Sequence, residues 1–168
     1  DKYVDIVHLL ADRRGGMTSG EIAKITGIDG KRLAKILNNL ERCDFVMRFK
    51  YYGKKNNDII YKLTDFYTLF YLKYIEPNID FYDEQWWQHH VASHSVESWL
   101  GLTFELLCLM HIRQIRQSLG IGGVATEVST WFDPADKSKA VKGSQIDLII
   151  ERADRIIHLC EMKFSQGE

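Results

Sequence analysis

Two carboxylates and a lysine stand in an otherwise apolar part of the sequence near its end. The segment Ser144–Lys163, SQIDLIIERADRIIHLCEMK, alternates in polarity like two strands around a polar turn centred on Asp154. In a hairpin symmetric about that residue, Asp147 stands directly opposite Glu161, with Cβ atoms about 4.5–5.5 Å apart. Because side chains alternate along a strand, Lys163 shares the face of Glu161.

Two carboxylates this close repel each other unless a proton or a cation lies between them. Mg²⁺ binds such oxygen ligands and usually keeps several waters in its coordination shell. A lysine beside the ion could orient or deprotonate one of those waters. The alternative is a structural salt bridge in the sheet, since many hairpins carry this pattern by chance. We expect a divalent-metal site here, for Mg²⁺ or Mn²⁺.

A further carboxylate, Glu105, stands in the apolar run Gly101–Cys108. Removing a charged group from water is costly, so this side chain either pairs with another group or binds something. The run belongs to a long helix that we expect from Val96 to about Leu119, because its apolar residues recur at helical spacing. A strand over Ala125–Phe132 and the two strands of the hairpin follow it.

The first part of the chain predicts three helices followed by two strands. Helical spacing predicts helices over 3–10, 21–26 and 31–42, the second capped by Thr18 or Ser19, with Glu21 placed for a capping box. Alternating residues predict strands over 45–52 and 59–63, joined by a polar tip. This order is typical of a winged helix-turn-helix domain. We expect one over residues 1–80, ending in an aromatic helix over 66–75.

Charge is distributed unevenly, although the net charge of the chain is only −1. Residues 24–62 hold ten Lys or Arg against four Asp or Glu, an excess of six positive charges. Residues 81–168 hold eight against twelve, an excess of four negative charges. The first half is therefore expected to meet an anionic partner.

A basic face on a helix-turn-helix unit predicts double-stranded DNA as that partner. The third helix would face the groove and the wing would touch phosphates. The alternative is a winged helix that docks on a protein and exposes a solvated basic face. The side chains expected to face DNA are Lys31, Arg32, Lys35, Asn38, Asn39, Lys54 and Lys55.

Cysteine content and hydropathy indicate the cellular compartment in which the protein is expected. Cys43, Cys108 and Cys160 each lie in an apolar run, and an odd count without paired spacing is typical of reduced core cysteines in a cytoplasmic protein. No apolar run approaches the roughly 20 residues that a membrane-spanning helix needs. We therefore expect a cytoplasmic globular protein without a membrane segment.

Glu105, Asp147 and the run Glu161-Met162-Lys163 together resemble the PD-(D/E)xK nuclease superfamily. In that superfamily the Asp and the Glu of the ExK element bind the metal, the helix Glu completes the site, and the Lys aids attack of water on a phosphodiester. The resemblance implies these roles for the four residues here. It also implies a restriction-endonuclease-like α/β domain over residues 81–168, and so a chain of α+β and α/β class.

Nearly the whole chain is similar to one group in particular, the C-terminal region of archaeal-type AAA+ ATPases. The likeness rests on Phe104-Glu105, Gln145-Ile146-Asp147 and Glu161-Met162-Lys163-Phe164-Ser165. It implies an ATPase module before the winged helix in the full-length chain. No Gly-x-x-x-x-Gly-Lys-Ser/Thr run is present in the sequence, so we expect no nucleotide site on these residues.

The superfamily core continues past the ExK strand with a helix and at least one more strand. Lys163 is followed here by five residues. An uncovered sheet edge is an unfavourable arrangement. We therefore expect a nuclease-like domain truncated at its C-terminus, with missing residues or a partner covering the open side of its sheet.

Two functions are consistent with these observations. The first is a DNA-associated, metal-dependent nuclease-like module that hydrolyses phosphodiesters. The second is a catalytically inactive nuclease fold that serves as a regulatory and assembly domain of an AAA+ ATPase. A transcription regulator with a ligand-sensing second domain is a weaker third, because it leaves Glu105 and Lys163 unexplained. The sequence does not decide the oligomeric state.

Overall fold

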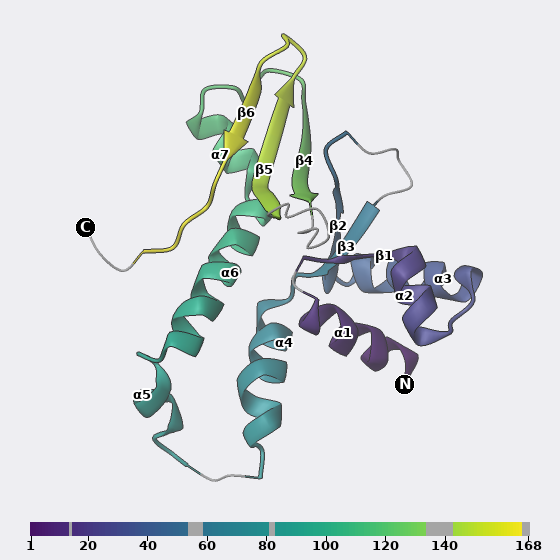
Figure 1. Cartoon of the computed structure of the whole chain (residues 1–168), viewed down its shortest axis with the longest axis vertical. Helices are drawn as coiled ribbons and strands as arrows, with labels where there is room; N and C mark the ends of the chain where they lie inside the picture. Colours follow the sequence, from purple (N-terminus) through teal and green to yellow (C-terminus); the bar gives the residue numbers. More distant parts are fainter. Residues whose placement is uncertain (14, 54–58, 81–82, 134–142, 166–168) are drawn as a thin grey trace. The chain divides into compact units, whose positions relative to one another are not determined.

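The computed structural model describes residues 1–13, 15–53, 59–80, 83–133 and 143–165. The chain contains helices and two sheets of three strands each, ordered β1–β3–β2 and β4–β5–β6 (Figure 1). It divides into two compact units, Asp1–Phe49 with Lys55–His89, and Lys50–Lys54 with His90–Glu168. The sequence placed the boundary near residue 80, and did not indicate that the end of the predicted strand over 45–52 belongs to the second unit.

The first unit is built from three amphipathic helices and a small sheet. The side chains of Ile6, Ile22, Leu37 and Val46 are almost wholly buried in its core. The three helices and two strands predicted for this region are present, and a two-residue strand, β1, is added to them. The elements are α1 (Lys2–Asp12), β1 (Met17–Thr18), α2 (Ser19–Thr26), α3 (Gly30–Arg42), β2 (Val46–Lys50) and β3 (Ile59–Leu63).

The start of α2 is fixed by the predicted capping box. The Glu21 N–H donates to Thr18 Oγ1 at 3.2 Å, and the Thr18 N–H donates to Glu21 Oε2 at 2.7 Å. Two N–H groups that the helix itself cannot satisfy are thereby hydrogen-bonded. Gly27 ends the helix with a φ of 65°, a left-handed conformation that favours glycine. The turn into α3 therefore follows from local sequence.

An aromatic segment closes the first unit. Instead of the single helix predicted over 66–75, α4 (Phe66–Phe70) continues as a π-helical turn (Tyr71–Ile75). Within this unit, rings of the segment pack on Trp86 and Trp87 at the start of α5 (Trp86–His90). The Phe70 centroid lies 5.4 Å from that of Trp87, and the Tyr74 centroid lies 5.8 Å from that of Trp86. The π-helical turn therefore lies in a segment whose rings pack against those of α5.

The second unit places two helices before its antiparallel sheet. The helix predicted over 96–119 is interrupted at His111, whose ring Nδ1–H donates to the Leu107 carbonyl at 2.7 Å. A continuous helix would use that carbonyl for the backbone N–H of residue 111, so the side chain competes with the helix. The elements are α6 (His94–Met110), α7 (Ile112–Ser118), β4 (Thr126–Asp133), β5 (Ser144–Arg152) and β6 (Ile157–Cys160).

Strand β5 is the central strand of this sheet. Its residues Leu148, Ile149 and Ile150 are buried on both faces, which accounts for their continuous apolar run. On the β4 side, the Tyr52 N–H donates to the Thr130 carbonyl at 2.8 Å, so the stretch after β2 extends this unit. Within the described residues, no helix has the length and apolar character needed to cross a membrane.

Candidate metal centre and nucleic-acid face

The hairpin β5–β6 has the predicted register. Leu148 is paired with Cys160 and Ile150 with His158, so the pairing is symmetric about Asp154. One further step along the same register would bring Asp147 opposite Glu161. The described ladder ends at the pair Leu148–Cys160, so the predicted register of the hairpin is confirmed, and the pairing of Asp147 with Glu161 stays a prediction.

Both carboxylate oxygens of Asp147 accept hydrogen bonds from the protein. Oδ2 accepts from the Met162 N–H at 2.8 Å, and Oδ1 accepts from Gln145 Nε2 at 3.0 Å. Each oxygen keeps a second lone pair, so the carboxylate can still bind a cation. Gln145 was not among the predicted site residues. Its place two residues before Asp147, on the same face of the strand, was the signal for it.

The Asp147 side chain also marks the end of β6. The predicted strand continues through Lys163, whereas β6 ends at Cys160. In an antiparallel ladder the Met162 N–H would next bond to the Ile146 carbonyl, and the Asp147 carboxylate accepts that hydrogen bond instead. The residues of the ExK run therefore lie just beyond the strand.

Glu161 and Lys163 form an ion pair with each other. Lys163 Nζ lies 3.2 Å from Glu161 Oε1, and both side chains are more than 70% exposed to solvent. A pair this exposed contributes little to stability, because water screens the charges and the long side chains lose freedom. The lysine therefore lies beside the acid of the ExK run, as the sequence predicted, at an accessible surface.

Glu105 lies half-buried on α6, one helical turn before Cys108. Burial raises the pKa of the Cys108 thiol, and the Glu105 carboxylate raises it further. Within the part of the chain that the structure describes, no three His, Cys, Asp or Glu side chains form a group that could hold a metal ion. The three-carboxylate set Glu105, Asp147 and Glu161 is therefore not assembled.

Two of the three predicted ligands remain suited to a divalent ion. Mg²⁺ is often bound by one or two carboxylates, and waters and substrate phosphates supply its other ligands. Asp147 offers an oriented carboxylate and Glu161 an exposed one on the neighbouring segment. Carboxylate oxygens are the type of donor that a hydrated Mg²⁺ or Mn²⁺ binds.

Helix α3 separates its apolar and basic residues. Leu33, Ile36, Leu37 and Leu40 are buried, while Lys35 and Asn38 between them face solvent. Asp29 caps the helix by accepting from two backbone N–H groups at 3.1 Å. Four of the predicted DNA-facing side chains are exposed on this helix: Lys31, Arg32, Lys35 and Asn38.

The other predicted DNA contacts have different positions. Asn39 is half-buried, and its Nδ2 donates to the Tyr3 hydroxyl of α1 at 2.6 Å. This amide therefore joins two helices of the first unit. Lys54 and Lys55 lie outside the residues that the structure describes.

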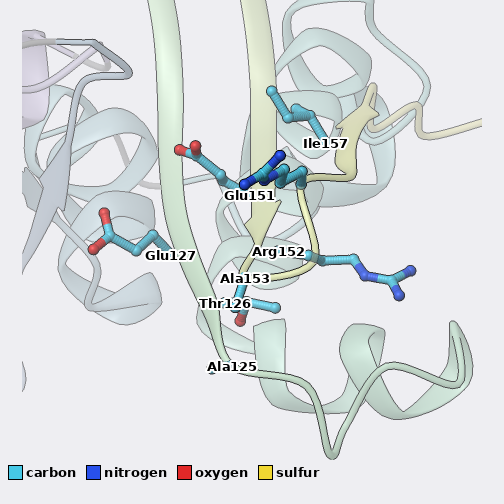
Figure 2. A pocket seen from close by; sticks show the side chains of 8 residues that line it. Ala125, Thr126, Glu127, Glu151, Arg152, Ala153 and Ile157 are labelled. Carbon is cyan, nitrogen blue, oxygen red and sulfur yellow. The ribbon is translucent and has the colours of Figure 1, made fainter.

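The second unit also contains a cavity of about 830 Å³ at the turn end of its sheet (Figure 2). Glu127 of β4 is paired with Glu151 of β5, and both line the cavity. Arg152, another lining residue, forms an ion pair with Asp154 and contacts His158 Nε2 at 3.4 Å. None of the predicted site residues lines this cavity, so it is separate from the Asp147 site.

Comparison of the chain with models of protein families, with curated proteins and with solved structures finds no match in any of the three.

Proposed function

We propose that the chain is a DNA-associated module. Its first unit acts as a winged helix-turn-helix that binds duplex DNA, and its second unit acts as a PD-(D/E)xK-like site for a divalent metal ion. The observation that carries the proposal is the exposed basic side of α3, opposite a side that is buried in the core. A helix fixed by its apolar side can present its polar side to a groove without rearranging.

The basic side chains of α3 support contacts to the phosphate backbone. Lys31 and Arg32 are adjacent, Lys35 lies one helical turn after them, and all three are exposed. Neutralising phosphates releases counterions, so these contacts give affinity that weakens with salt. Asn38 lies on the same exposed side, and an Asn side chain can pair with adenine in the major groove.

The end of the β5–β6 hairpin supports the metal-dependent part of the proposal. Asp147 and Glu161 would hold the ion, and Gln145 keeps the Asp147 carboxylate in one orientation. When bound, Mg²⁺ polarises a phosphoryl oxygen and lowers the pKa of a coordinated water. Lys163, close to Glu161, would position the attacking oxygen or remove its proton.

Binding to a fluorescent DNA duplex tests the first unit. Replacing Arg32 and Lys35 with Ala removes two phosphate contacts, so the slope of log affinity against log salt becomes less negative by about 2. Lys73→Ala, at an exposed lysine of the aromatic segment, is the matched control and leaves the slope unchanged. An unchanged slope in the double variant excludes α3 as the DNA-binding element.

Plasmid cleavage with Mg²⁺ or Mn²⁺ tests the second unit. The wild type is compared with Asp147→Ala and Lys163→Ala, which remove a metal ligand and the ammonium group, respectively. We expect both variants to lose at least about 100-fold in rate, the range in which removal of a general acid or base falls. Equal rates in all three proteins exclude this site as the source of cleavage.

A second candidate function is supported by a separate observation. In the described part of the chain Glu105 does not join Asp147 and Glu161 in a three-ligand group, which favours a nuclease-like fold without activity. Such a domain would serve in the regulation and assembly of an AAA+ ATPase module of the same full-length chain. Calorimetry with Mn²⁺ separates the two: saturable heat that Glu161→Ala abolishes supports the nuclease, and absence of heat supports the assembly domain.

Free thiols support a reducing compartment for either function. Cys43, Cys108 and Cys160 form no disulfide with one another. Cytoplasmic thiols are kept reduced, whereas secreted domains of this size commonly carry disulfides. We therefore propose the cytoplasm as the location of the protein.

A further inference from the structure

An exposed aromatic ring lies next to the Asp147 carboxylate. Phe132 of β4 is paired with Gln145 of β5, and these two strands lie side by side (Figure 1). Gln145 Nε2 donates to Asp147 Oδ1 at 3.0 Å. Because paired residues of a sheet lie on the same face, the Phe132 ring shares a face with the polar side chains of the candidate metal site.

The Phe132 ring is accessible to a ligand. The residue is 52% exposed, and the described residues place no other aromatic ring in contact with it. Its neighbours in β4, Trp131 and Asp133, direct their side chains to the opposite face. Phe164, on the segment after β6, differs from it, because that ring packs on Phe104 of α6 with the centroids 6.0 Å apart. The face of the Phe132 ring can therefore receive a planar group.

The ring and the carboxylate are close enough for one nucleotide to contact both. Asp147 lies two residues after Gln145, so it is a diagonal neighbour of Phe132 across the two strands. Diagonal neighbours in a sheet are roughly 7–8 Å apart, a separation that aromatic side chains can span. In a nucleotide only the sugar separates the base from the phosphate. A phosphate held by a metal ion at Asp147 would therefore bring a base of the same strand within reach of the ring.

A nucleobase can stack on a side chain only when it lies outside a duplex. Within a double helix the faces of each base are covered by the neighbouring bases, and enzymes that act on a base must first extrude it. A single strand offers its bases freely, and aromatic side chains bind them by stacking, largely without regard to sequence. An exposed ring beside a phosphate-binding site therefore favours an unpaired strand as the ligand.

We propose that the nucleotides next to the phosphate at the Asp147 site are unpaired, and that Phe132 recognises them by stacking on a base. This role rests on the proposed function, because the Asp147 site supplies the contact to the phosphate. Helix α3 would bind the duplex part of the same substrate. The substrate class is therefore a duplex that ends in a single-stranded overhang or flap. Phe132 determines specificity for it and takes no part in the chemistry.

Base stacking can be distinguished from an ordinary apolar contact by the shape of the side chain. Single exposed apolar residues are common on protein surfaces, and Leu can take the place of Phe where only apolar area matters. Stacking on a base requires a flat π-system, which Tyr has and Leu lacks. Phe132→Tyr should therefore keep the stacking contact, and Phe132→Leu should lose it.

Binding of a single-stranded oligonucleotide that carries a fluorescent adenine analogue tests the stacking. Ca²⁺, another cation that carboxylate oxygens bind, replaces Mg²⁺ to keep the strand intact. The wild type and Phe132→Tyr should quench the fluorescence. Phe132→Ala and Phe132→Leu should quench little and bind at least about fivefold more weakly, the lower end of the loss for one stacked base. Tyr67→Ala, at an exposed ring of the first unit, is the matched control and should behave like the wild type.

Cleavage with Mg²⁺ tests the substrate class. The wild type should cleave a duplex with a single-stranded overhang at least about fivefold more efficiently than a blunt duplex of the same sequence. In Phe132→Ala that preference should disappear through a higher KM, with kcat within about twofold, because stacking contributes equally to binding of the ground state and the transition state. Thermal unfolding of the variant should match that of the wild type, whereas a merely structural role would lower stability and slow cleavage of both substrates alike.

Equal affinity of the wild type and Phe132→Ala for the oligonucleotide overturns the proposal. Wild-type affinity in Phe132→Leu overturns it as well, because it would assign the ring to an ordinary apolar contact. A strand that is bound and quenched, while no substrate is cleaved, contradicts the nuclease and supports the stacking. Cleavage that requires Asp147 but is unchanged in Phe132→Ala supports the nuclease and overturns the stacking, so the two proposals can fail separately.

Discussion

At the scale of single residues, Asp147 has two separable roles. Its carboxylate ends strand β6 by accepting the Met162 N–H, and it is oriented by Gln145. The same group is a candidate ligand for a metal ion. A structural role and a binding role can be distinguished, because only the first contributes to stability in the absence of metal.

Replacing Asp147 with Ala leaves the half-buried Met162 N–H without this acceptor. We expect the free energy of unfolding to fall by about 1–3 kcal/mol, the cost of breaking a hydrogen bond to a charged group. Glu161→Ala removes an exposed carboxylate and should change stability by less than about 0.5 kcal/mol. Urea denaturation in the presence of a chelator measures both, and equal losses would contradict a structural role for Asp147.

The three cysteines should differ in reactivity. Burial raises the pKa of the Cys108 and Cys160 thiols above the ordinary 9.0, with Glu105 adding to the effect at Cys108. A raised pKa keeps the unreactive thiol form, so both should be alkylated several-fold more slowly than the exposed Cys43 at pH 8. The alkylation rates of Cys108 and Cys160 should keep rising above pH 9. Mass spectrometry after timed iodoacetamide treatment measures this order, and fast labelling of Cys108 would contradict it.

At the scale of secondary structure, local signals decide where helices begin. Thr18→Ala removes the acceptor of the Glu21 N–H and should lower the free energy of unfolding by about 0.5–2 kcal/mol. Ser19→Ala, at the next and exposed residue, is the matched control and should have little effect. Thermal and urea unfolding of the two variants measure the difference. A larger loss of unfolding free energy in the Ser19 variant than in the Thr18 variant would show that Ser19, and not Thr18, caps the helix.

The elements that the sequence predicted correctly are those with strong local periodicity or caps. Apolar spacing fixes α3, and the capping box fixes α2. The symmetric turn around Asp154 likewise fixes the register of the last hairpin.

The departures from prediction arise where a side chain competes with the backbone. The His111 ring takes a helix carbonyl and divides a predicted helix into two, and the Asp147 carboxylate shortens a predicted strand. Helical and strand periodicity cannot predict that a side chain will take a hydrogen bond that the backbone would otherwise make. The relation of Glu105 to the hairpin depends on packing between elements, so the predicted three-carboxylate group could not be checked from spacing alone.

At the scale of the whole molecule, the proposed function assigns DNA binding and metal binding to different units. Arg32→Ala with Lys35→Ala should weaken DNA binding about tenfold or more at 150 mM salt and leave the heat of Mn²⁺ binding unchanged. Glu161→Ala should abolish that heat and leave DNA affinity within about twofold. Fluorescence anisotropy and calorimetry on the same preparations measure both. If either variant lost both its DNA affinity and its heat of Mn²⁺ binding, the two functions would not be divided between the two units.

The hydrogen bond between Tyr52 and Thr130 has a consequence for the order in which the protein is made. Residues 50–54 belong to the second unit but emerge from the ribosome long before β4. The first unit has all its residues once His89 has been synthesised, whereas the early stretch must wait for its partner strand. Nascent chains long enough for His89 to have left the ribosome, but stalled before β4 emerges, should therefore protect the N-terminal core from protease before Tyr52 becomes protected.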